Sequence, residues 1–207
     1  MSLDLAFNLA VFGSTFVVLL VIMDPPGSIP VFLGLMSGRT RKQVSSAALM
    51  AVFTSMVVIT TFAIFGEQVL RYMKISLPAL QGAGGLLLLI VSLELLTGES
   101  EEPTKSQDKT VAMVPLGTPL LAGPGAIVAT ILAVRSGEGV VGAPLAIATA
   151  IVSVHAVIYL SLRYSGLIAR ILKPSGIRVV ARLAGLLLAA IAVQLIADAV
   201  FGFIETM

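Results

Sequence analysis

The sequence predicts an all-α fold: a polytopic membrane bundle of six transmembrane helices, arranged as an inverted 3+3 repeat with helices 1 and 4 broken. The first observation is composition. Of 207 residues, 57% are hydrophobic and only 12% are charged, with a mean hydropathy of +1.06. A soluble domain carries about 25% charged residues, so this chain belongs in a membrane. The other two observations are six long apolar stretches and a repeated interruption rich in proline and glycine.

Each apolar stretch approaches the roughly 20 residues that a membrane helix needs. In order they cover residues 5–36 (helical over 5–23 and 28–36), 44–65, 75–97, 111–134 (interrupted at 123–125), 140–162 and 177–204. All six are expected to be helices, because the stretches are too long for barrel strands. Residues 1–98 then form a first three-helix repeat, 99–110 a polar cytoplasmic linker, and 111–207 a second, inverted repeat.

The interruption reads DPPGSIP over residues 24–30 and AGPGAI over residues 122–127, an offset of 98 residues when the Pro-Gly pairs are aligned. Proline removes a backbone donor and glycine permits unusual dihedrals, so each break is expected to unwind about a turn. Unpaired backbone groups at membrane depth must be buried in protein or line a wet cavity. Matching breaks in two halves of a chain point to the binding site of a transporter.

The two halves also share a second pattern, GGLLL at 84–88 and AGLLL at 184–188, at an offset of 100 residues. A repeat unit of three helices is odd, so its second copy must enter the membrane from the opposite face. Small residues recur at helical spacing, for example at Ala146 and Ala150. Such faces serve either packing within the chain or a homo-oligomer.

The predicted substrate site lies at the two breaks. A half-helix that begins after a break has free N–H groups and a positive dipole end, which suit a carboxylate, whereas unwound carbonyls suit a cation or an ammonium group. Two such ends can hold a zwitterion, one charge at each. The alternative is that both breaks only shape the bundle. The predicted binding residues are Asp24, Pro25, Pro26, Gly27, Ser28, Gly123, Pro124, Gly125 and Ala126.

Two further groups of residues carry candidate roles. Asp24 lies in an apolar run, and such acids usually mark an ion or proton pathway, so it is predicted to couple Na⁺ or H⁺ or to pair with a substrate amine. Its alternative role is an N-cap for the following helix. His155, the one histidine, is predicted to gate or hydrogen bond with Thr54 and Ser55, or to be a satisfied packing residue.

Several function classes find little support. The chain has no cysteine, one histidine and scattered acids, so no metal site and no cofactor beyond a coupling ion are expected. Neither a phosphate-binding loop nor a G-x-S-x-G elbow is present, which disfavours a nucleotide-driven pump and an enzyme. Scattered basic residues disfavour nucleic acid. A metal-ion permease and a non-transporting membrane scaffold or regulator stay as alternatives to a secondary transporter.

Lys and Arg are distributed unevenly between the two sides of the predicted bundle. Ten of the 13 lie in the loops after the first, third and fifth stretches or in their flanks, and three lie on the other side. Because cytoplasmic loops are richer in Lys and Arg, both termini are predicted to lie outside the cytoplasm.

The motifs DPPGSIP (24–30) and VPLGTPLLAGPGAI (114–127) resemble the paired signatures of the MarC family of prokaryotic integral membrane proteins, which includes SnatA-like small neutral amino acid transporters. The family more often has an apolar residue and Asn where this chain has Pro26 and Ser28. The resemblance covers nearly the whole chain. It implies six helices in the prokaryotic inner membrane and ion-driven transport of glycine, alanine or similar solutes, which alternating access would accomplish.

Overall fold

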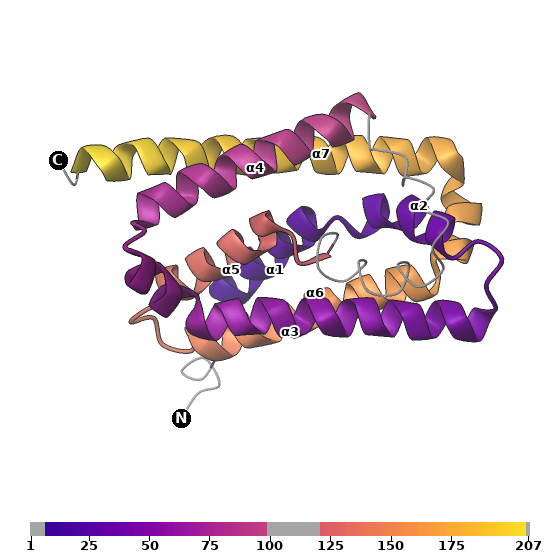
Figure 1. Cartoon of the computed structure of the whole chain (residues 1–207), viewed down its shortest axis with the longest axis horizontal. Coiled ribbons are helices and arrows are strands. Elements are labelled where there is room, and N and C mark those ends of the chain that lie inside the picture. Colours follow the sequence, from indigo (N-terminus) through magenta and orange to yellow (C-terminus); the bar gives the residue numbers. More distant parts are fainter. Residues whose placement is uncertain (1–6, 99–120, 206–207) are drawn as a thin grey trace.

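The computed structural model describes residues 7–98 and 121–205, and the regular elements of these residues are helices (Figure 1). This confirms the all-α fold for the described part of the chain. The helices in chain order are α1 (Leu9–Met23), α2 (Pro25–Leu35), α3 (Arg41–Met73), α4 (Leu77–Thr97), α5 (Pro124–Ser136), α6 (Ala143–Arg163) and α7 (Ser165–Glu205).

Five spans are long and apolar enough to cross a membrane. They are α1 with α2 (27 residues), α3, α4, α6 and residues 175–205 of α7. The helix α5 has 13 residues and is too short to cross alone. The rest of the expected fourth span, together with the 99–110 linker, falls largely outside the described residues. The chain is therefore a bundle of membrane-spanning helices, and its sixth crossing stays a prediction.

The helices form three layers, which Figure 1 shows from the side. One outer layer is the long antiparallel pair α4 and α7, and the opposite layer is the pair α3 and α6. The shorter helices α1, α2 and α5 lie between them. Within this middle layer α2 packs against α6 and α7, whereas α5 packs against α3 and α4. The first and last described helices, α1 and α7, begin and end at the same end of the bundle (Figure 1).

Glycines allow α4 and α7 to approach closely. A Cβ atom on Gly85 would lie 2.8 Å from the Ala192 carbonyl oxygen, and one on Gly185 would lie 3.1 Å from that of Ser92. The two contacts are reciprocal. Gly185 lies 100 residues after Gly85, and Ser92 lies 100 residues before Ala192. Small residues at such positions let membrane helices pack backbone to backbone.

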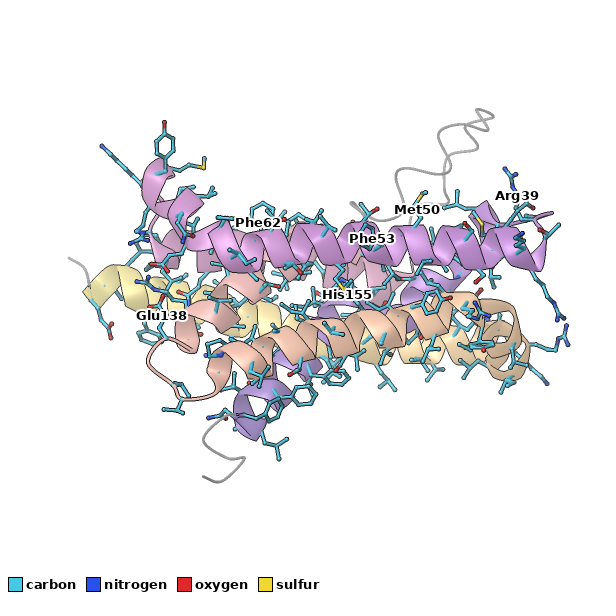
Figure 2. All side chains as sticks on the ribbon, turned by 90° about the horizontal axis from the view of Figure 1, so that it is seen from below. Arg39, Met50, Phe53, Phe62, Glu138 and His155 are labelled. Carbon is cyan, nitrogen blue, oxygen red and sulfur yellow. The ribbon has the colours of Figure 1, made fainter. Side chains whose placement is uncertain are left out.

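Apolar side chains lie both inside and outside the bundle. Leu19, Phe32 and Ile59 are among the fully buried core residues. Met50 and Phe53, by contrast, are at least 50% exposed and lie on the outer side of α3 in Figure 2. An apolar outer surface of this extent suits contact with lipid. The small-residue face of α6, which includes Ala143, Ala146 and Ala150, is buried within the chain.

Two helix boundaries differ from the prediction. The second helix was expected over 44–65 but runs from Arg41 to Met73, because Thr40 and Gln43 form a capping box at its start and helical backbone continues past its apolar part. The region before 177 was expected to be a loop, yet α7 begins at Ser165. The helix breaks at Lys173 (φ 55°, ψ 165°), since the residue before a proline is pushed out of the α region.

Candidate functional site

The first helix break consists of one non-helical residue. The helix α1 ends at Met23 and α2 begins at Pro25, so only Asp24 departs from helical geometry, with φ 37° and ψ 70°. Left-handed backbone is uncommon outside glycine, although Asp and Asn adopt it more readily than other residues. The prediction that this break unwinds about a turn is therefore wrong, because only one residue leaves helical geometry.

Two prolines and a serine explain why the break is so short. Pro25 and Pro26 begin α2, where the missing N–H groups of proline leave no intrahelical bond unmade. Ser28 donates to the Asp24 carbonyl oxygen twice, from its N–H at 3.1 Å and from its hydroxyl at 3.0 Å. Among the first three residues of α2, only Gly27 carries an N–H. The break thus has one backbone donor, the Gly27 N–H beside the Asp24 carboxylate, and the Ser28 hydroxyl proton is used within the fold.

The Asp24 carboxylate is buried at the start of α2. The residue is 9% exposed, and its Oδ1 atom has no hydrogen-bond partner. Its Oδ2 atom lies against Gly27, where a Cβ would come within 1.9 Å of it. The side chain stands at the N-cap position but makes no capping hydrogen bond. A buried carboxylate with an unpartnered oxygen is suited to binding a cation or a proton.

The second break also ends at a proline that begins a helix, but its chemistry differs. Gly123 is extended (φ −63°, ψ 164°), and α5 begins at Pro124. The Gly123 carbonyl oxygen accepts the N–H groups of Ala126 at 3.0 Å and Ile127 at 3.2 Å. Because Pro124 has no N–H, the first turn of α5 keeps one backbone donor without an intrahelical acceptor, at Gly125. The neighbouring residue is Ala122, so this helix start lacks the acid found at the first break.

The tertiary structure brings the two breaks together. Met23, Ala122 and Ala126 belong to one buried cluster. A Cβ on Gly125 would lie 3.5 Å from the Cγ2 atom of Ile22, two residues before Asp24. In Figure 1, α2 and α5 begin near the middle of the bundle and run toward opposite ends. The partially positive N-terminal ends of both half-helices therefore lie near the middle of the bundle's length, and only one of them has a carboxylate beside it.

A cavity of about 480 Å³ lies between α1, α5 and α7, and its lining comes within five residues of each break, at Leu19 and Ala129. Its lining is mostly apolar but includes Thr15, Ser136 and Gln194. Gln194 also donates to the Asp198 carboxylate at 2.7 Å. These residues were not predicted to belong to the site, because isolated hydroxyl groups are common in apolar helices and do not show which way they face. The one available signal was the repeat, which aligns Gln194 with Glu94.

His155 and Ser55 form a buried pair between α6 and α3 (Figure 2). The Nδ1 atom of His155 lies 2.7 Å from the Ile151 carbonyl oxygen, and its Nε2 atom lies 3.1 Å from the Ser55 hydroxyl. A carbonyl oxygen only accepts, so Nδ1 carries a proton, and in the neutral ring Nε2 accepts from Ser55. Thr54 is half-buried and donates to the Met50 carbonyl oxygen of its own helix, so it is not part of this pair.

Replacing Ser55 by Ala is expected to lower the free energy of unfolding by about 1 kcal/mol, because it leaves the buried Nε2 atom of His155 unsatisfied. Thr54→Ala, one residue away, removes a hydroxyl that bonds only within its own helix, so it is the matched control and should change stability little. A double-mutant cycle of Ser55→Ala with His155→Leu, followed by unfolding in detergent, measures the coupling. A coupling energy of zero would show that the two side chains do not stabilise each other.

The chain is similar to known membrane proteins of bacteria and archaea. Residues 9–204 match the MarC family integral membrane proteins. A UPF0056 membrane protein of Aquifex aeolicus is 34% identical over 90% of this chain and 91% of its own length. One of Archaeoglobus fulgidus is 33% identical over 95% of each chain. The UPF0056 inner membrane protein MarC of Citrobacter koseri is 30% identical over 94% of this chain and 96% of its own. No solved structure matches significantly. The chain belongs to the MarC family of integral membrane proteins.

Proposed function

We propose that this protein is a secondary transporter of small neutral amino acids such as glycine or alanine, driven by an ion gradient and working by alternating access. The observation that carries the proposal is the meeting of two half-helix N-termini near the middle of the bundle's length, with a buried carboxylate at only one of them, one of whose oxygens has no partner. Broken helices at membrane depth are typical of transporter sites.

The asymmetry of the two breaks suggests how a zwitterion binds. The unpartnered Oδ1 atom of Asp24 would accept hydrogen bonds from the substrate ammonium group. The α5 start, with its Gly125 N–H and no neighbouring acid, would receive the carboxylate. The opposite orientation would bring two carboxylates together at Asp24. A substrate with one ammonium and one carboxylate group matches these two ends, and the tight packing of Ile22 and Leu88 around Gly125 favours a small side chain.

An inverted repeat of the two halves underlies the proposed mechanism. Three observations support it. The contacts of Gly85 and Gly185 across α4 and α7 are reciprocal. The helix α2 of the first half packs on α6 and α7 of the second half. In the same way, α5 of the second half packs on α3 and α4 of the first half. Ser55 and His155, which are 100 residues apart, meet each other. Two halves related in this way can expose one central site to each side of the membrane in turn.

The cavity between α1, α5 and α7 would be the approach to the site from one side. It lies toward the end of the bundle where α1 begins, and its lining residues Leu19 and Ala129 are close in sequence to the two breaks. At the same end, Arg135 of α5 forms an ion pair with Glu67 of α3. By the distribution of Lys and Arg, this end faces away from the cytoplasm of the prokaryotic cell whose inner membrane holds the protein.

Counterflow of labelled glycine and alanine in proteoliposomes tests the proposal. We expect saturable exchange that an imposed Na⁺ or H⁺ gradient accelerates, with each ion tested separately. Glycinamide, which lacks the carboxylate, and glycolate, which lacks the ammonium group, should both compete poorly, since each loses one of the two helix ends. Flux of divalent metal ions without amino acid flux would favour the metal permease, and no flux from folded protein would favour a scaffold or regulator.

A further inference from the structure

A second pocket, of about 630 Å³, lies at the end of the bundle opposite to Glu138, where the α2–α3 connection, the end of α6 and the start of α7 meet. Figure 2 shows Arg39 at this end and Glu138 at the other. We call it the arginine pocket. The residues that define it here are Arg39, Arg41, Ser45, Arg163, Ser165 and Arg170.

The arginine pocket concentrates positive charge. Among the residues that the structure describes, four arginines line it and no Asp or Glu does. The ion pairs found among residues 7–98 and 121–205 all lie at the other end of the bundle, around Glu67 and Arg135. Several guanidinium groups around one hollow repel each other unless an anion lies between them. The planar fork of arginine matches the oxygens of phosphate particularly well.

Arg163 is oriented by contacts within the fold. Its guanidinium group donates to the Tyr159 hydroxyl at 2.9 Å and to the Ser45 hydroxyl. It also lies over the rings of Tyr159 and Tyr164, 5.9 Å and 5.8 Å from their centroids. These contacts hold the side chain at the pocket wall, so less conformational entropy is lost when it binds an anion.

Ser165 adds a separate observation. The residue is 1% exposed, and its Oγ atom is buried without a hydrogen-bond partner. A buried hydroxyl without a partner is costly, which indicates that the pocket is built for a group that this hydroxyl can bind. Ser165 also begins α7. The N–H groups of Leu167 and Ile168 in its first turn donate to the Tyr164 carbonyl oxygen. The N–H groups of Ser165 and Gly166 precede these bonds and add a partial positive charge.

We propose that the arginine pocket binds a phosphate group. The group comes either from the headgroup of an anionic phospholipid or from free phosphate. The pocket lies at the ends of membrane-spanning helices, and Leu33 and Leu167 also line it, so it offers apolar contacts beside the charges. Basic pockets between membrane helices are suited to anionic headgroups. The inference does not depend on which solute the protein transports, because binding rather than transport tests it.

Native mass spectrometry of the purified full chain tests the lipid source. We expect phosphatidylglycerol to bind saturably at one site and phosphatidylcholine to bind much more weakly. The variant with Arg41→Gln and Arg170→Gln, both exposed side chains, should lose about fivefold in affinity for each arginine. The matched control with Arg178→Gln and Arg182→Gln removes two arginines of α7 outside the pocket and should bind as the wild type does. Circular dichroism verifies that each variant is folded.

Ser165→Ala separates recognition from net charge, because it removes the unpartnered hydroxyl and leaves every arginine. We expect a reduction of a few fold in affinity. Thermal unfolding in sodium phosphate against sodium chloride of equal ionic strength tests the free-phosphate source. Stabilisation by phosphate that the pocket variants lose, without a preference for phosphatidylglycerol, would assign that source. Binding of neither probe, or equal losses in the pocket and control variants, would overturn the proposal.

Discussion

Asp24→Asn is expected to reduce glycine counterflow by about tenfold or more and at the same time to raise the stability of the protein. The transport loss follows because a hydrogen bond between charged groups contributes about 1.5–3 kcal/mol, and the amide cannot replace the carboxylate toward an ammonium group or a coupling cation. The stability gain follows because the buried carboxylate has an oxygen without a partner. An amide carries no charge into the apolar bundle.

Asparagine is the right replacement for two reasons. It has nearly the same shape, and it tolerates the left-handed backbone at this position (φ 37°), whereas alanine would add strain. Asp198→Asn is the matched control, because it neutralises another helix acid whose oxygen is bonded to Gln194. Counterflow and thermal unfolding in detergent measure the two effects. Unchanged flux would show that Asp24 shapes the helix break but does not take part in transport. A variant less stable than the wild type would show that the charge of Asp24 has a stabilising partner.

Gly27→Ala tests the same site without changing its charge. The added methyl group would occupy the position of the Asp24 Oδ2 atom, so the carboxylate must turn away. We expect the apparent affinity for glycine to fall, although the acid is still present. Gly34→Ala in the same helix meets no atom within 4 Å and is the control. If Gly27→Ala behaved as Gly34→Ala does, the position of the carboxylate would not matter for binding.

Gly85→Val and Gly185→Val are expected to prevent most of the protein from folding. At Gly85 the new side chain would begin 2.8 Å from the Ala192 carbonyl oxygen, and at Gly185 it would begin 2.9 Å from the Leu95 Cβ atom. Backbone and Cβ atoms cannot rotate away, so α4 and α7 must separate along their shared length. Overpacking costs about 1–3 kcal/mol, and the loss of close helix contacts adds to it.

The control for this pair is Gly34→Val, which adds the same β-branched side chain to a helix where nothing lies within 4 Å. Size-exclusion chromatography measures the folded fraction, and thermal unfolding measures the stability of what remains. The two glycines occupy matching positions of the repeat, so both substitutions should harm folding, with Gly185→Val slightly milder because its contacts are a little longer. A severe effect at one glycine and none at the other would contradict the reciprocal packing of the two halves.

The sequence alone determined the class of the protein and where its helices break. Hydropathy and length are local properties of a segment, so the apolar spans could be recognised without knowing which helices they pack against. Proline at Pro25 and Pro124 has a local effect as well, because it removes a backbone donor wherever it stands. The boundaries that were missed, the long α3 and the early start of α7, lie where the chain leaves its most apolar stretch and hydropathy no longer reports on helix formation.

The tertiary structure alone decided which side chains meet. Thr54 and Ser55 were equally good partners for His155 from the sequence, yet only Ser55 reaches it. In a soluble helix, polar residues would mark the outer face, but a membrane helix is apolar toward lipid and toward its neighbours, so the pattern does not identify the buried side. For the same reason, only the folded chain brought the two breaks together and gathered the four arginines around the buried Ser165 hydroxyl.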